Sequence, residues 1–188
     1  MTTAELYNEL NYVNHSREKR LYYANLVTDN PDLIPKLLDI LFMVDDKISP
    51  RAAWVFEFMC NNDIEIIIPY LNMFTKNMKR VHMDSAVRPI AKICEFLAKS
   101  YTSKTNNNIK NVLTETHRER IIETCFDFMI NDEKIAPKAY SMNALFLLGK
   151  EYDWVHPELV LILERDFQIQ SSGFKARARH ILKKIKKQ

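Results

Sequence analysis

Side chains that could do acid, base or metal chemistry are present in this 188-residue chain, but they are scattered along it. The five histidines do not cluster in sequence: they are His15, His82, His117, His156 and His180. The patterns HExxH, GxSxG and CxxC are absent, and two glycines are too few for a phosphate-binding loop. The sequence therefore identifies no catalytic, cofactor-binding or metal-binding residue. It leaves open whether residues distant in sequence converge on an active site.

The three cysteines also argue against a metal site or a disulfide framework. Cys60, Cys94 and Cys125 lie far apart in apolar stretches, which is typical of free buried thiols in a reducing cytoplasm. The N-terminus lacks a basic segment followed by an apolar run, and no stretch approaches 18 apolar residues. We therefore expect a cytoplasmic protein with no cofactor and no membrane span.

Four basic residues recur with a period. Arg51, Arg88, Lys138 and Lys175 are separated by 37, 50 and 37 positions, and each opens a segment with helical apolar spacing. The segments 45–52 and 132–139 are identical at five of eight positions. Self-similarity at this period is the signature of stacked helix pairs.

The helix before three of the four basic positions is marked by proline. An apolar-x-Pro-x-Leu pattern occurs at 33–37, 67–71 and 155–159, so one unit is a proline-bearing helix, a turn and a second helix. The run 64–68 is rich in β-branched residues and could pass for a strand, but its place in the repeat favours a helix. The long interval of 50 predicts an inserted polar loop at about 100–112, either a binding loop or a solvated linker.

The second-helix pattern resembles a known family. Asp84-Ser85-Ala86-Val87-Arg88 with Ala91 is similar to the second helix of HEAT repeats, and the proline helices are similar to the first. The resemblance covers most of residues 30–187. It implies an all-α fold, a right-handed α-α superhelix (solenoid) of about five HEAT-like helix pairs, in a single domain over 1–188. Pro89 and the proline-free segment 113–130 depart from the pattern.

Two roles are open for the basic row. Asp46, Asp84 and Asp132 can cap the second helices, and the Arg or Lys that follows can pair with that aspartate or with one of a neighbouring repeat. Alternatively, the same basic residues contact a ligand directly.

The resemblance also implies a binding face, because second helices of HEAT pairs line the concave side. It places Glu57, Lys92, Glu95 and Asn143 there as candidate partner contacts. Tyr152 and Trp154 follow Gly149, which we expect to end the helix that begins near Ala136. These aromatic residues either line a groove or seal the junction between helix pairs.

The strongest charge feature is at the C-terminal end. Residues 175–187 hold seven basic side chains and no acidic one, and the rest has 20 basic against 24 acidic residues. We expect a basic amphipathic capping helix at 174–188 whose outer face either provides solubility or contacts phosphate or an acidic protein. Its candidate partner contacts are Lys175, Arg177, Arg179, Lys183 and Lys184.

Together these features favour a non-catalytic helical-repeat scaffold that binds an unidentified protein partner through its concave groove. The alternative is nucleic-acid binding through the basic helix and Trp154, with or without DNA glycosylase-like chemistry. HEAT-like alkylpurine DNA glycosylases show that this fold can bind DNA, with basic residues spread over several repeats. No membrane contact is expected, and the sequence does not indicate the oligomeric state.

Overall fold

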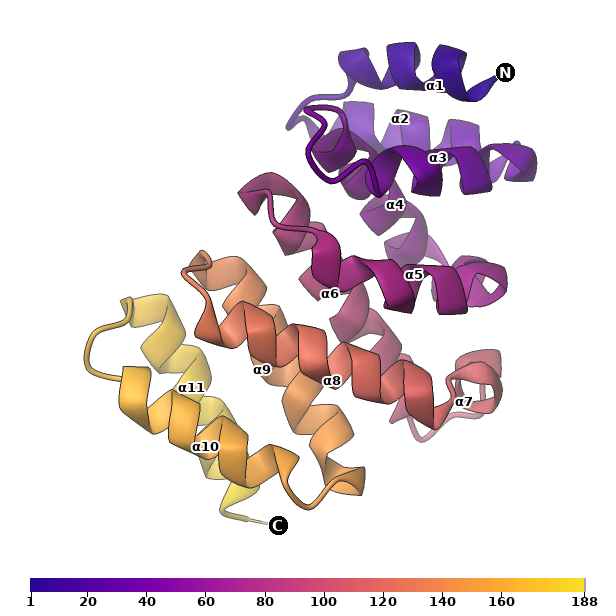
Figure 1. Ribbon diagram of the computed structural model, residues 1–188. Helices are drawn as coiled ribbons and strands as arrows, with labels where there is room; N and C mark the ends of the chain where they lie inside the picture. Colours follow the sequence, from indigo (N-terminus) through magenta and orange to yellow (C-terminus); the bar gives the residue numbers. More distant parts are fainter. Residues whose placement is uncertain (188) are drawn as a thin grey trace. The chain divides into compact units, whose positions relative to one another are not determined.

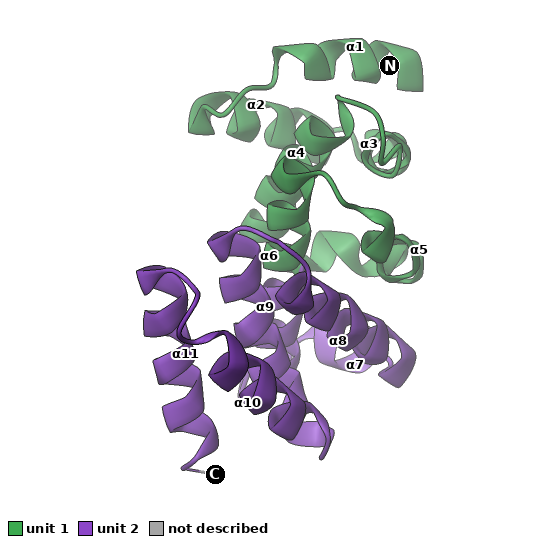
Figure 2. Ribbon diagram, turned by 60° about the vertical axis from the view of Figure 1, so that its left-hand side comes forward, with its two compact units in different colours: residues 1–93 green, residues 94–188 purple. Residues whose placement is uncertain are grey.

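The computed structural model describes residues 1–187, and over that range its regular structure is entirely helical. The chain divides into two compact units, unit 1 at Met1–Ile93 and unit 2 at Cys94–Gln188 (Figure 2). The boundary lies inside one helix, α6 (Asp84–Tyr101). Gln188, the last residue of the expected basic helix, is outside the described residues.

Unit 1 contains α1 (Thr3–Glu9), α2 (Arg17–Thr28), α3 (Ile34–Leu41), α4 (Ser49–Asn62), α5 (Leu71–Asn77) and the first part of α6 (Figure 1). The second helix α4 packs against both α3 and α2, and α1 packs against α3. Large apolar side chains fill this contact, including Leu37, Phe56 and Phe74, all fully buried. Their spacing puts the apolar face of each helix toward its neighbours.

Unit 2 contains α7 (Asn108–Val112), α8 (Glu115–Ile130), α9 (Ile135–Leu148), α10 (Val155–Asp166) and α11 (Ser172–Ile185). Here α9 is the central helix, because α8, α10 and α11 all pack against it. Its core includes the fully buried Cys125, Leu145 and Phe174. In both units the helices are therefore paired in the order that the sequence period predicts, and the all-α fold is confirmed.

The basic residues lie where the period places them. Arg51, Arg88, Lys138 and Lys175 all fall near the start of a second helix, in α4, α6, α9 and α11 respectively. Gly149 is the C-cap of α9, as expected.

Local structure differs from expectation in two places. The stretch 100–112 is only partly a loop, because α6 continues to Tyr101 and α7 occupies Asn108–Val112. The run at Ile64–Tyr70 is helical, as expected, but as a 3₁₀ helix with Pro69 inside it. Proline lacks the N–H that a regular α-helix would use there, which explains why α5 starts only after it.

Candidate functional site

Polar residues of the second helices in unit 1 bind one another. Glu57 of α4 is 1% exposed. Its two carboxylate oxygens accept from Arg88 at 2.6 Å and from Lys92 at 2.7 Å, both on α6. A buried carboxylate needs such charged partners to offset its desolvation. This cluster therefore joins two consecutive second helices.

The same arrangement recurs in unit 2 between α6 and α9. Glu95, which is 5% exposed, accepts a hydrogen bond of 2.8 Å from the side-chain amide of Asn143. Lys99 lies 3.0 Å from its other carboxylate oxygen. The residues expected to contact a partner from the second helices thus make internal contacts. Their role in partner binding stays a prediction.

Three of the four residues in the basic row, Arg51, Arg88 and Lys138, have internal partners, and these are not the turn aspartates. The ammonium of Lys138 is 3% exposed and donates to the Met129 carbonyl, in the last turn of α8, at 3.0 Å. Arg51 donates to the Leu10 carbonyl at 3.3 Å. These carbonyls lie at helix ends, where a cation is favourable. Asp46 accepts from the Ile48 N–H at 2.7 Å just before α4, but the N-cap residues of α4 and α9 are Ile48 and Lys134 rather than aspartates.

The segment that carries Trp154 is held by a close approach at Gly149. A Cβ at this glycine would lie 2.5 Å from Cδ2 of His156, so only glycine fits without displacing the ring. Nε2 of His156 lies 2.9 Å from the Phe146 carbonyl oxygen, and the two rings stack. This part of the aromatic cluster seals the junction between α9 and α10.

A second set of contacts fixes the same segment. Tyr101 donates a 2.9 Å hydrogen bond to Glu151, and Nε of Arg118 lies 3.4 Å from that carboxylate. The Arg118 guanidinium also lies over the Tyr101 ring at 4.6 Å. Burial, followed by the Glu151 hydrogen bond, raises the pKa of Tyr101. Tyr152 is half-buried, and burial of its hydroxyl raises the pKa of that group.

Trp154 itself faces outward. Its side chain is 55% exposed, and its ring stacks on Phe126 with centroids 5.5 Å apart. A pocket of about 310 Å³, here called the tryptophan pocket, is lined by these two residues together with Glu119, Glu123, Asp127, Ile130 and Glu158. Ile130 is 56% exposed, so two large apolar side chains meet solvent together here.

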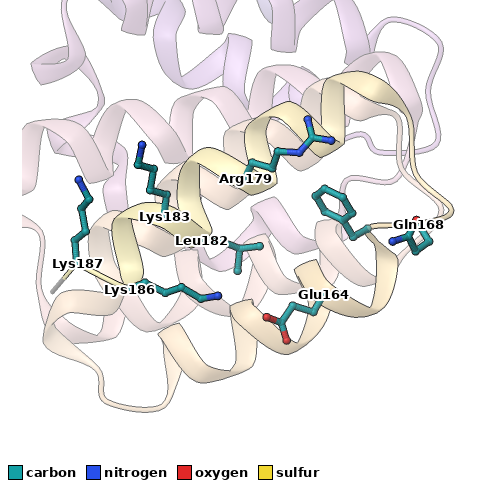
Figure 3. Close-up of a pocket in the computed structure, with 8 residues that line it drawn as sticks. Glu164, Gln168, Arg179, Leu182, Lys183, Lys186 and Lys187 are labelled. Carbon is teal, nitrogen blue, oxygen red and sulfur yellow. The ribbon is translucent and has the colours of Figure 1, made fainter.

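A larger groove of about 620 Å³ lies between α10 and α11 (Figure 3). Its lining is Glu164, Phe167, Gln168, Arg179, Leu182, Lys183, Lys186 and Lys187. Among the predicted tail contacts, Arg179 and Lys183 line this groove. Arg177 is exposed outside it, Lys184 lies 5.4 Å from the Phe146 ring, and Lys175 is half-buried.

Several residues that line the two pockets were not predicted from the sequence as binding residues. Glu119, Glu123 and Asp127 repeat at four-residue spacing beside Phe126 and Ile130. Acidic residues with this spacing are typical of a solvated surface, but here an apolar edge runs along them. Phe167 and Leu182 were missed because the groove needs two helices, and neither helix alone shows it.

The remaining candidates for chemistry are buried or dispersed. Within residues 1–187, no group of three or more His, Cys, Asp or Glu side chains is positioned to hold a metal ion. A hydrogen bond with Cys125, together with burial, raises the pKa of the Cys94 thiol. Burial raises the pKa of the Cys60 thiol. Thiols in this protonated form are poor nucleophiles.

Comparison with known proteins decides the family. A family model described as a HEAT repeat domain matches residues 7–185, nearly the whole chain. The chain belongs to the HEAT-repeat family. Its helix pairs are thus HEAT repeats, and its fold class is the all-α solenoid. The search of curated proteins and the search of solved structures found no match to this HEAT-repeat chain. No helix within residues 1–187 combines the length and apolar character of a membrane span.

Proposed function

We propose that this HEAT-repeat chain is a non-catalytic scaffold that binds a protein partner. The observation that carries the proposal is the tryptophan pocket, where Trp154 and Ile130 are each more than half exposed. Large aromatic and aliphatic side chains gathered in one exposed pocket are typical of protein-binding surfaces. The HEAT-repeat family supports the same function, since its helical-repeat scaffolds commonly bind proteins.

The firm positioning of Trp154 strengthens this proposal. Gly149, His156 and the Arg118–Glu151 contact restrain the residues on both sides of the indole. A side chain held in place loses little conformational entropy when a partner covers it. The pocket is therefore the first contact site that we propose, with Lys92 and Asn143 of the second helices as further predicted contacts along a concave groove. We also propose a cytoplasmic location, because the three free thiols suit a reducing compartment.

A photo-crosslinking experiment tests the scaffold proposal. A benzoylphenylalanine residue replaces Trp154 in one variant and Tyr12, which is 65% exposed in unit 1, in a control variant. After irradiation in extract of the native cells, we expect discrete protein adducts from position 154. We expect none of these adducts from position 12. Identical adduct patterns from both positions, or no adduct from position 154, would contradict the proposal.

Nucleic-acid binding is the second candidate, and exposed cations of α11 favour it. Arg177, Arg179, Lys183 and Lys184 are all exposed, with no acidic residue on that helix. Binding through them would weaken steeply between about 50 and 200 mM salt, because each phosphate contact releases counterions. It would also disappear when residues 175–188 are deleted. Absence of DNA and RNA binding at low salt would exclude this candidate.

A further inference from the structure

The groove between α10 and α11 combines an apolar floor with a basic rim. Phe167, in the segment after α10, and Leu182 of α11 are half-buried in it. Figure 3 shows Leu182 pointing from α11 toward α10. The volume of the groove, about 620 Å³, is in the range of sites that hold an amino-acid side chain with its neighbours. The groove therefore offers a place for an inserted apolar side chain.

Four cations surround this floor. Arg179 and Lys183 belong to α11, and Lys186 and Lys187 follow its last residue, Ile185; all four are exposed. Arg179 and Lys183 are four residues apart, so they lie on one side of the helix. At 1.5 Å per residue, Arg179 and Lys183 are separated by about 6 Å along α11, or roughly one helical turn. Anionic groups of a ligand must therefore be spaced by about one helical turn to meet both.

One cation is already oriented. The guanidinium of Arg179 lies 5.2 Å from the centroid of the Phe167 ring. A guanidinium that lies over the face of a ring keeps the N–H donors at its outer edge accessible, and these can bind both oxygens of a carboxylate. The arginine thus couples the apolar floor to an anion-binding edge.

The lining favours a carboxylate-bearing peptide over a nucleic-acid backbone. Glu164 also forms part of the groove, so the anionic groups of any ligand are favoured only on the side of Arg179 and Lys183. Lys186, just after α11, extends toward Glu164, which leaves a rim of mixed charge on that side (Figure 3). A phosphodiester chain also has no apolar group to place against Leu182 and Phe167. A peptide helix with apolar and acidic faces meets both demands.

We propose that the α10–α11 groove binds an acidic amphipathic helix of a protein partner, with an apolar side chain on Leu182 and Phe167 and carboxylates on the basic rim. This inference rests on the proposed scaffold function and names the chemistry of one partner segment. It concerns a different surface from the tryptophan pocket.

Fluorescence anisotropy with synthetic peptides tests it. The probe is a labelled helix-forming peptide with Leu and Phe on one face and Glu at four-residue intervals beside them. A matched peptide has Ser in place of every Leu and Phe. We expect the full-length protein to bind the first peptide at least about tenfold more tightly than the second, because charge alone leaves the floor unfilled. Equal affinities would overturn the proposal.

A matched pair of variants locates the binding. Lys183→Glu reverses a rim charge, and Arg177→Glu makes the same change on an exposed residue of α11 outside the groove. We expect Lys183→Glu to weaken peptide binding about tenfold and Arg177→Glu to weaken it less than about twofold. Both are surface changes, and unchanged melting curves check the fold. Equal effects of the two substitutions would show that the peptide is attracted by diffuse charge, and would overturn the proposal that it binds in the groove.

The remaining ligands of a basic surface serve as competitors. A single-stranded oligonucleotide or phosphatidylserine vesicles that displace the peptide at equal charge concentration would assign the surface to phosphate and overturn the proposal. Failure of peptide binding together with adducts at position 154 would overturn this inference alone. Failure at both places would remove the scaffold function as well.

Discussion

The two tryptophans of the chain show that its two units use the same kind of side chain differently. In unit 1, the indole N–H of Trp54 donates to the Ser85 carbonyl at 2.6 Å, and the Arg20 guanidinium lies over its ring at 5.7 Å. In unit 2, Trp154 stacks on Phe126 and remains 55% exposed. One indole joins helices inside its unit. The other is held in place but leaves much of its surface for a partner.

Carboxylates repeat the contrast. Glu57 is almost fully buried, and each of its oxygens accepts from a basic side chain. Glu119 and Glu158 are exposed at the edge of the tryptophan pocket. Charge on a repeat helix therefore has two uses, and burial distinguishes them. A buried charge stabilises the stacking of neighbouring helices, whereas an exposed one remains available to steer a partner.

The largest expected effect comes from breaking the buried carboxylate. Glu57→Gln leaves Arg88 and Lys92 without their counter-charge, and we expect it to lower the free energy of unfolding by about 2–3 kcal/mol. This is below the full cost of breaking a buried pair because both cations are partly exposed. Urea unfolding followed by Trp54 fluorescence, in a Trp154→Phe background, measures it in unit 1.

The matched control for that change is Glu119→Gln in unit 2. An exposed carboxylate contributes little to stability, so we expect a change within about 0.5 kcal/mol. If both substitutions lowered the free energy of unfolding equally, the contrast between structural and exposed carboxylates would be wrong.

The tryptophans provide the next test. We expect Trp54→Ala to lower the free energy of unfolding by about 2 kcal/mol, since it removes a hydrogen bond and leaves a void beside Arg20. Trp154→Ala should lower it by less than about 1 kcal/mol, because much of that ring is already in water. Thermal or urea unfolding of the two variants gives both values. A larger loss for Trp154 would mean that its main role is structural.

A smaller effect should follow from crowding the support of Trp154. Gly149→Ala places a methyl group against His156, and overpacking of this kind costs about 1–2 kcal/mol. The variant should also loosen the indole, which a red shift and faster quenching of Trp154 fluorescence by acrylamide would show in a Trp54→Phe background. Replacement of both Gly149 and His156 by alanine removes the overlap with the ring and leaves only a contact of 2.9 Å with Cγ1 of Val155, so it serves as the control. Undiminished stability of the single variant would contradict the close approach.

Repeat architecture could be predicted from sequence because it depends on spacing alone. The row from Arg51 to Lys175 marks the second helix of each pair, namely α4, α6, α9 and α11. The proline pattern marks the first helix of three pairs. Stacked pairs contact only their neighbours, so a period is enough to order them. The ends of the helices near 100–112 were harder to predict from the sequence. Short helices such as α7 depend on local contacts, for example the cap at Asn107.

Binding surfaces were less predictable for a physical reason. Trp154, Arg179 and Lys183 were singled out by type, but nothing in one helix shows that Phe126 supports the indole or that Phe167 lies under Arg179. Glu57 and Glu95 lie on second helices at positions expected to face the groove, yet both are buried and bind partners inside the protein. Exposure is a property of packed pairs, and sequence spacing alone does not determine it.

The smallest expected effect concerns pH and unit 2. Hydrogen bonds from Arg165, aided by the charge of Lys138, lower the pKa of the Asp166 carboxyl. A carboxyl with a lowered folded pKa adds stability above the ordinary aspartate value of about 3.9, and that stability is lost as the pH falls through the folded value. Between about pH 5 and 3, the wild type should therefore lose stability more steeply than Asp166→Asn. Arg165→Gln removes the same hydrogen bonds and should flatten the slope too. If the double variant were flatter than either single one, Arg165 would act through another acid, and the Asp166 contact would not explain the acid sensitivity of this helix end.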